Sequence, residues 1–149
     1  MTTKIKGDPI EILLIEDNPG DIEFTRIAFK EYKFNNKLNV VRDGESALDY
    51  LHQKGKYQKA VKPDIIILDL TLPGIDGFEV LTTIKKDEKL ENIPVVILTS
   101  SDREEDIEKA YENYASCFVS KPLNFEQFVK IIKSMNDFWL SIVTLPGKE

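Results

Sequence analysis

Five short apolar runs, separated by stretches of helical periodicity, constrain the fold of this 149-residue chain more than any other feature. The runs have the length of strands and are apolar almost throughout, as expected for strands covered on both faces. The predicted strands are Ile10 to Ile15, Leu38 to Arg42, Ile65 to Leu68, Val95 to Leu98 and Cys117 to Val119. This alternation predicts an α/β fold, with five βα units, (βα)5, in a doubly wound parallel sheet.

The segments between these runs carry apolar residues at helical spacing, so each is expected to lay one face on the sheet. The spaced residues are Phe24, Ile27 and Ala28; Ala47 and Leu51; Val80 or Leu81 with Ile84; and Ile107, Ala110 and Tyr111. A longer apolar stripe from Phe125 to Trp139 predicts the last helix, with Asn124 as its N-cap.

The length of the chain fits one domain, so one functional site is expected. We predict a single domain over residues 1–149, with a core of about residues 9–135 and a C-terminal extension of about residues 136–149. An enlarged polar loop runs from His52 to Pro63. No linker or room for a DNA-binding output domain is apparent.

Charge and cysteine content exclude several classes of function. The formal net charge of -6 and the pI near 4.9 argue against a nucleic-acid surface, which needs a basic face. Cys117 is the only cysteine, so neither an internal disulfide nor a cysteine-based zinc site can form. No apolar run is long enough for a signal peptide or a membrane span. We expect a cytoplasmic protein that binds neither nucleic acid nor membrane.

Carboxylates interrupt the apolar pattern where two predicted strands end. Glu16 and Asp17 follow the first strand, and Asp69 follows the third. Doubly wound sheets bind their ligands at the carboxyl ends of the strands, so these side chains are expected to meet. At an effective dielectric of about 20, two carboxylates about 4 Å apart repel by roughly 4 kcal/mol, and a cation must compensate. Mg²⁺, which prefers carboxylate and carbonyl oxygens, is the predicted cofactor.

A phosphoryl-transfer site explains the remaining polar residues at this edge. Asp69 is the candidate nucleophile, because it stands alone at its strand end while the acidic pair can hold the cation. Such transfer requires positive charge near the phosphoryl oxygens, which the Lys121 ammonium and the Thr99 hydroxyl can supply. Taken alone, the acidic pair before an Asn-Pro cap would equally suit a helix N-terminus. Its occurrence together with Asp69, Thr99 and Lys121 favours the phosphoryl site.

The chain resembles the receiver domains of two-component response regulators over nearly its whole length, from Ile10 to Trp139, and four stretches carry the resemblance. They are ILLIEDNP, IIILDLTLPGIDG, PVVILTSS and FVSKPLN, in the order and spacing of that family. The resemblance implies a flavodoxin-like strand order, 2-1-3-4-5. It also implies that a histidine kinase phosphorylates Asp69, that Lys121 contacts the phosphoryl group and that the bond from Lys121 to Pro122 is cis.

The same resemblance assigns a metal site and a switch. It implies that Mg²⁺ is held by Glu16, Asp17, Asp69 and the backbone carbonyl of Thr71. In the family, the hydroxyl at the Thr99 position moves toward the phosphoryl group and an aromatic residue of the fifth strand turns inward. That aromatic is Phe118 here, although a core aromatic would fit the sequence nearly as well. Many receivers have Asp-Asp where this chain has Glu-Asp, and Phe118 lacks the hydroxyl of the commoner Tyr.

The enlarged loop and the ending FWLSIVTLP resemble the single-domain response regulators that partner bacterial and cyanobacterial phytochrome kinases. That subgroup implies a homodimer formed through the last helices and the C-terminal extension. The apolar tail could instead fold back on its own domain, but dimerisation explains it better. The candidate interface residues are Phe138, Trp139, Leu140, Ile142, Val143 and Leu145.

We therefore expect a response regulator that takes a phosphoryl group onto Asp69 and signals through protein contacts. It would catalyse its own phosphorylation and dephosphorylation without being a turnover enzyme. A phosphorylation-independent receiver that acts as a binding module is the nearest alternative. A Mg²⁺-dependent phosphatase is less favoured, because its usual general acid would stand where Thr71 is. A flavodoxin-like carrier is disfavoured, because two carboxylates would repel a flavin phosphate.

Overall fold

A computed structural model describes residues 9–31, 36–100, 103–115, 117–121, 126–127, 130 and 134. Its strands form one parallel sheet in the order β2-β1-β3-β4-β5, which confirms the predicted fold class and strand order. The strands are β1 (Ile10–Ile15), β2 (Asn36–Val41), β3 (Ile65–Leu68), β4 (Val95–Thr99) and β5 (Cys117–Ser120). The β2 strand begins two residues before its predicted start, because Asn36 pairs with Ile10 at the start of β1.

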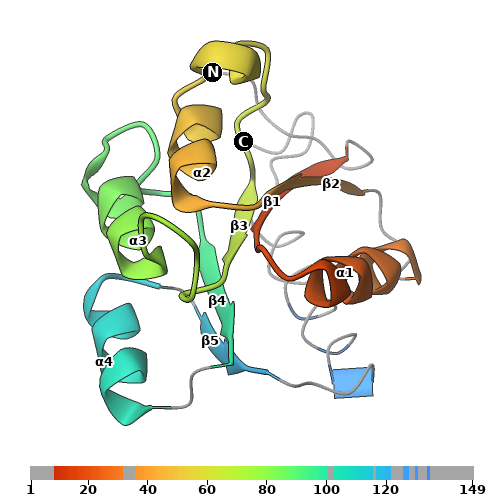
Figure 1. The fold of residues 1–149 in the computed structure, drawn as a ribbon, viewed down its shortest axis with the longest axis vertical. Helices are drawn as coiled ribbons and strands as arrows, with labels where there is room; N and C mark the ends of the chain where they lie inside the picture. Colours follow the sequence, from red (N-terminus) through yellow and green to blue (C-terminus); the bar gives the residue numbers. More distant parts are fainter. Residues whose placement is uncertain are drawn as a thin grey trace, which may run out of the picture.

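Helices cover both faces of the sheet, as Figure 1 shows. Ordered along the chain, they are α1 (Pro19–Glu31), α2 (Gly44–Leu51), a 3₁₀ turn at Gly55–Tyr57, α3 (Gly77–Lys86) and α4 (Glu104–Glu112). The α1 helix packs on one face, and α2, α3 and α4 pack on the other (Figure 1). No helix within the described part of the chain is both long and apolar enough to cross a membrane.

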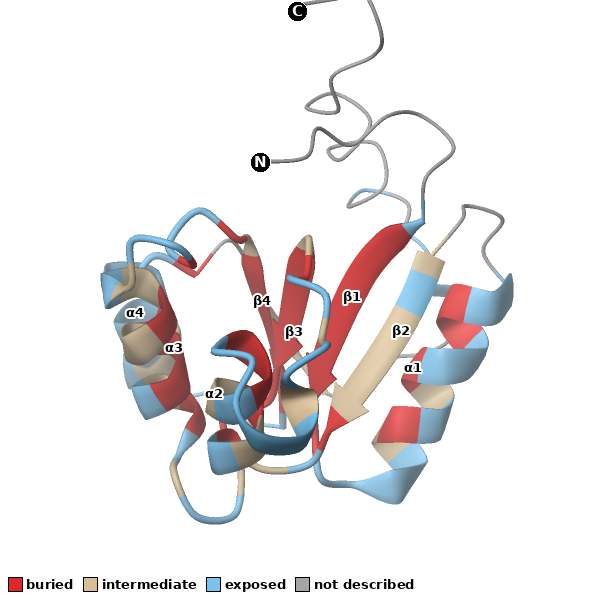
Figure 2. Ribbon diagram, turned by 90° about the horizontal axis from the view of Figure 1, so that it is seen from above, coloured by how far each residue is buried: buried red, intermediate tan, exposed pale blue. Residues whose placement is uncertain are grey.

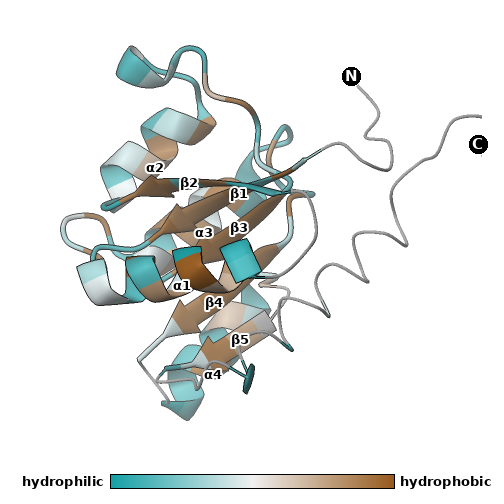
Figure 3. Cartoon of the chain, turned by 90° about the vertical axis from the view of Figure 1, so that its right-hand side faces the viewer, coloured by the Kyte–Doolittle hydropathy of each residue, from teal (hydrophilic) through white to brown (hydrophobic). Residues whose placement is uncertain are grey.

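Alternate side chains of each central strand supply two cores. Leu13, Ile66 and Ile97 belong to the core beneath α2, α3 and α4. Ile12 and Ile67 belong to the core beneath α1. Figure 2 shows the central strands buried and the edge strand β2 only partly covered, and Figure 3 shows hydrophobic strands beneath hydrophilic outer helix faces. The continuous apolar character of the strands in the sequence follows from this burial on both faces.

The inward face of α1 contains Ala28 and Phe24 as predicted, but it differs from the prediction at one position. Ile27 was expected on the sheet but is 45% exposed, whereas Thr25 is buried with Ile22 and Phe29. Thr25 can be buried because its Oγ1 donates to the Asp21 carbonyl at 2.8 Å, which satisfies the hydroxyl inside the helix. The apolar spacing therefore predicted the helix and the inward side of Phe24 and Ala28 correctly, and it was wrong only for Ile27.

Tyr111 of α4 was also expected to face the sheet, and it is 49% exposed. Its Oη accepts a hydrogen bond of 3.1 Å from the backbone N–H of Phe118 in β5. A polar tip that must reach the strand explains why the ring stays at the surface. The predicted N-cap Asn124 and the apolar stripe of the last helix lie outside the described residues.

Two helices follow the strand ends that carry the carboxylates, and a local feature sets the start of each. The Asn18 Oδ1 accepts from the Asp21 backbone N–H at 3.0 Å and caps the start of α1, as predicted. At the start of α3, a Cβ on Gly77 would lie 2.6 Å from the carbonyl oxygen of Asp69. Only glycine allows α3 to begin so close to the segment after β3. Both turns hold the polar edge of the sheet in place.

Candidate functional site

Three carboxylates meet where β1 and β3 end. Glu16 and Asp69 are buried, at 1% and 4% exposure, and Asp17 is exposed. One carboxylate oxygen of each residue lies within 4.8 Å of those of the other two. Backbone hydrogen bonds set this arrangement, since the Asp69 N–H donates to the Ile15 carbonyl at 3.0 Å. The structure thus brings together the three carboxylates that the sequence assigned to a metal site.

Lys121, directly after β5, reaches into this cluster. Its Nζ lies 2.5 Å from Glu16 Oε1, 3.1 Å from Asp69 Oδ2 and 2.8 Å from Asp21 Oδ2. The backbone N–H of Lys121 donates to the Thr99 carbonyl at 2.6 Å, which ties the start of the side chain to the end of β4. The ammonium group supplies the positive charge that clustered carboxylates require.

The two oxygens of Asp69 have different partners. Oδ1 accepts from the backbone N–H and from Oγ1 of Thr71, both at 3.0 Å. Oδ2 faces Lys121. Thr99 is fully buried at the end of β4, and its side chain hydrogen-bonds Asp69. Thr71 therefore orients the carboxylate through its donors, while its predicted role as a carbonyl ligand stays a prediction.

The carboxyls of Glu16 and Asp69 have opposite pKa shifts. Burial, aided by the Asp69 charge and opposed by Lys121, raises the pKa of Glu16 from 4.5 to about 7. Burial also acts to raise the pKa of Asp69, but the Thr71 backbone N–H and Glu16 outweigh it and lower that pKa. Lys121 and Thr99 add to the lowering. The pair therefore keeps its last proton on Glu16, which leaves Asp69 ionised and available as a nucleophile.

The ammonium of Lys121 is also strongly held in its charged form. Burial acts to lower its pKa, but hydrogen bonds to Asp21 and Glu16 and the charge of Asp69 outweigh burial and raise it. An ammonium that stays charged beside a buried nucleophile suits the stabilisation of a phosphoryl group.

The carboxylates have the chemistry of a divalent-cation site. The group consists of two buried carboxyls, Glu16 and Asp69, which share the Lys121 ammonium, and the exposed Asp17; Glu16 keeps a proton that a cation would displace. Oxygen-only donors with an open side toward solvent fit Mg²⁺ or Mn²⁺, which retain waters on one side. The donor set therefore fits the predicted metal.

Asp21 is a site residue that the sequence analysis missed. It lies in the first turn of α1 and pairs with Lys121 across 100 positions of sequence. An acidic residue in the first turn of a helix is ordinarily explained by the helix dipole. One feature of the sequence could have indicated this role. Asp21 lies one helical turn after the acidic pair, and it is therefore near the edge of the sheet where Lys121 follows β5.

The structure describes the predicted switch residue but not the predicted interface residues. Phe118 is half-buried in β5 and packs against the core beneath α2, α3 and α4. Its role as a switch stays a prediction. The tail residues Phe138, Trp139, Leu140, Val143 and Leu145, and Pro122 with the predicted cis bond, lie outside the described residues.

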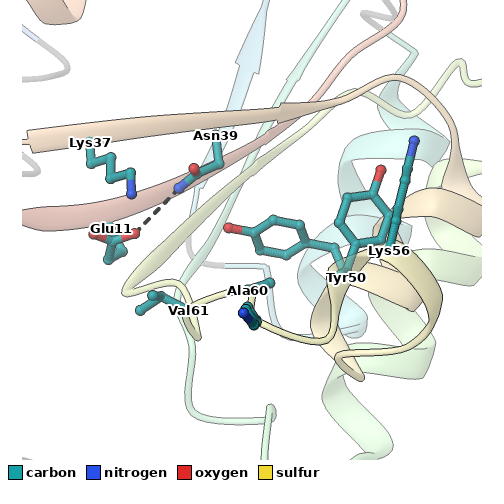
Figure 4. A pocket seen from close by; sticks show the side chains of 9 residues that line it. Glu11, Lys37, Asn39, Tyr50, Lys56, Ala60 and Val61 are labelled. Carbon is teal, nitrogen blue, oxygen red and sulfur yellow. Dashed lines mark hydrogen bonds between the residues drawn. The ribbon is translucent and has the colours of Figure 1, made fainter.

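A hollow of about 230 Å³ lies near the opposite end of β1, away from the carboxylates (Figure 4). Its lining is Glu11, Lys37, Asn39, Tyr50, Lys56, Tyr57, Lys59, Ala60 and Val61. Within it, Asn39 Nδ2 donates to Glu11 Oε1 at 3.4 Å. Since β-strands rise about 3.3 Å per residue, Glu11 is roughly 16 Å from Glu16, too far to share its chemistry.

Comparison with known proteins agrees with this geometry. The family model of the response regulator receiver domain matches residues 12–133. Response regulator Rcp1 of a Synechocystis strain is 39% identical over 139 residues, which cover 93% of this chain and 95% of that protein. The probable methanogenesis regulatory protein FilR2 of Methanothrix harundinacea is 39% identical over 142 residues, which cover 94% and 90% of the two chains.

Two solved structures have the same fold over nearly the whole chain. The Mn²⁺-bound form of response regulator Rcp1 superposes with a TM-score of 0.81 at 39% identity, covering 93% of this chain and 100% of that one. The phosphorylated cyanobacterial phytochrome response regulator RcpA superposes with a TM-score of 0.82 at 42% identity, covering 94% and 100%.

Proposed function

Because this chain belongs to the response regulator receiver domain family, we propose that it accepts a phosphoryl group from a histidine kinase on Asp69, in a reaction that depends on Mg²⁺. One observation carries the proposal. The ionised Asp69 accepts from the Lys121 ammonium at 3.1 Å and lies beside the acidic pair that can hold a cation. The phosphorylated form of the relative RcpA supports the same chemistry.

The proposed transfer uses the chain's own groups in a simple sequence. An Asp69 oxygen attacks the phosphorus of the donor phosphohistidine, and the new O–P bond forms as the N–P bond breaks. The electron pair of the broken bond stays on the imidazole nitrogen. Lys121 and the Thr99 hydroxyl donate to the phosphoryl oxygens, and bound Mg²⁺ supplies further positive charge there. Hydrolysis returns the Asp69 carboxylate and inorganic phosphate when water attacks the phosphorus.

Mass measurement after incubation with acetyl phosphate tests this function. With Mg²⁺ we expect a gain of one phosphoryl group, and with a chelator in place of the metal we expect none, because the carboxylates then repel the incoming phosphate. A failure to gain mass when calorimetry shows that Mg²⁺ binds would favour the binding-only receiver instead.

We propose a phytochrome-like kinase as the phosphoryl donor. The support is the 42% identity to the cyanobacterial phytochrome regulator RcpA, together with the enlarged loop between α2 and β3. FilR2, a methanogenesis regulator of comparable identity, is the reason to test other kinases alongside. In this role the protein acts in the cytoplasm, as a self-catalysing phosphoacceptor rather than a turnover enzyme, without nucleic-acid or membrane contacts.

We also propose that the C-terminal extension forms a homodimer. The support is its run of apolar residues, which includes Phe138, Trp139 and Leu140. A chain that ends before Phe138 should show about half the mass of the full chain in light scattering, because a two-fold interface would lose its apolar centre. An unchanged mass would mean that the tail covers its own domain.

A further inference from the structure

Lys121 has one partner that the proposed function does not use. Three carboxylates accept from its ammonium group, and the third, Asp21, lies 2.8 Å from Nζ. The Lys121 side chain is only 12% exposed, so these partners rather than water fix its position. Asp21 does not belong to the group of carboxylates that could hold a metal ion among the described residues.

The three acceptors differ in what phosphoryl transfer requires of them. Glu16 must turn an oxygen to the cation, and Asp69 must give an oxygen to the phosphorus. An ammonium has three N–H donors and needs an acceptor that stays in place while the other two change. Asp21 is the acceptor that no step of the transfer displaces.

The backbone of Asp21 is anchored on both sides. Its N–H donates to Asn18 Oδ1 at 3.0 Å, and its carbonyl accepts from the buried Thr25 hydroxyl at 2.8 Å. Its side chain is 41% exposed, whereas the Glu16 side chain is 2% exposed. Asp21 therefore presents a carboxylate from a rigid helix turn without the desolvation cost that the buried carboxylates bear.

We propose that Asp21 is a positioning residue for phosphoryl transfer: it holds the Lys121 ammonium beside Asp69 and acts only through Lys121. This inference rests on the proposed function. The alternative is an acidic residue that only stabilises the N-terminus of α1. The two explanations predict different results when Lys121 is absent. Stabilisation of the helix N-terminus does not depend on Lys121, whereas the positioning role does.

A double-mutant cycle separates them. At saturating Mg²⁺, Asp21→Asn should slow phosphorylation by acetyl phosphate about fivefold, the size expected for a partly exposed ion pair. In a Lys121→Ala background the same change should have no further effect. The control is Glu23→Gln, which removes the charge of an α1 side chain that is 64% exposed and should leave the rate unchanged. The proposal is overturned if Asp21→Asn lowers the phosphorylation rate equally in both backgrounds, or if it does not lower the rate in the natural protein.

A second measurement needs no phosphorylation. In the metal-free protein, the NMR signal of the Lys121 ammonium, assigned by its loss in Lys121→Ala, should exchange with water faster in Asp21→Asn but not in Glu23→Gln. Unchanged exchange in Asp21→Asn would overturn the pairing itself. If the natural protein takes up no phosphoryl group while exchange accelerates as expected, the proposed function fails and the pairing stands.

Discussion

Asp69→Asn should take up no phosphoryl group under conditions in which the natural protein gains one. The amide lacks the nucleophilic oxygen, and among the residues that the structure describes only Asp69 is held between Lys121 and Thr71. The fold should persist, because the amide oxygen can still accept from the Thr71 N–H and Lys121 keeps Glu16 and Asp21. Intact-protein mass after incubation with acetyl phosphate and Mg²⁺ measures the outcome.

The matched control is Asp49→Asn, which changes an exposed aspartate on α2 and should gain mass as the natural protein does. Continued labelling of Asp69→Asn would refute the assignment of the acceptor. Peptide mapping of the labelled residue would then decide between Asp17 and Glu16. Loss of labelling in both variants would instead indicate that general charge, not the acceptor, controls uptake.

The sequence predicted the fold and the meeting of the carboxylates for one physical reason. Strands that are buried on both faces must be apolar, so a carboxylate can stand only where such a strand ends. Parallel strands end at one edge, and Glu16 and Asp69 therefore had to be neighbours once β1 and β3 were adjacent. The order that makes β1 and β3 adjacent came from the family resemblance, not from periodicity.

Features that depend on side-chain hydrogen bonds could not be predicted in this way. Thr25 can be buried because its hydroxyl is hydrogen-bonded within its own helix and no longer needs water. Asp21 meets Lys121 because α1 and the end of β5 converge at the edge of the sheet where the strands end, a distance that no local pattern encodes. The periodicity of apolar residues predicts which side chains are buried. It does not predict which polar side chains form hydrogen bonds with each other.

Metal-free protein should lose stability as pH rises from about 5 to 8, the opposite of the usual behaviour of carboxylates. The pKa of Glu16 is raised from 4.5 unfolded to about 7 folded, so the folded state binds the proton more tightly. Its contribution is complete below pH 4.5 and is lost as pH rises through 7. The loss should be on the order of 3 kcal/mol in the free energy of unfolding, followed by urea denaturation at each pH.

Asp69 contributes in a different pH window, so the two can be told apart. Its pKa is lowered, and its contribution is present above 3.8 and is lost only in stronger acid. Glu16→Gln should therefore flatten the dependence of stability on pH between pH 5 and 8.

Mg²⁺ should also remove the fall in stability of the natural protein, because it binds the ionised pair and stabilises the folded state by about 2.7 kcal/mol at a hundredfold excess over its dissociation constant. If the metal-free profile rises with pH and Mg²⁺ adds nothing at pH 8, Glu16 is neither the proton carrier nor a metal ligand. If the stability of the metal-free protein falls with pH and Mg²⁺ restores it, one carboxyl exchanges a proton for a cation. Protonation of Glu16 then stabilises the fold of the site in the absence of the metal.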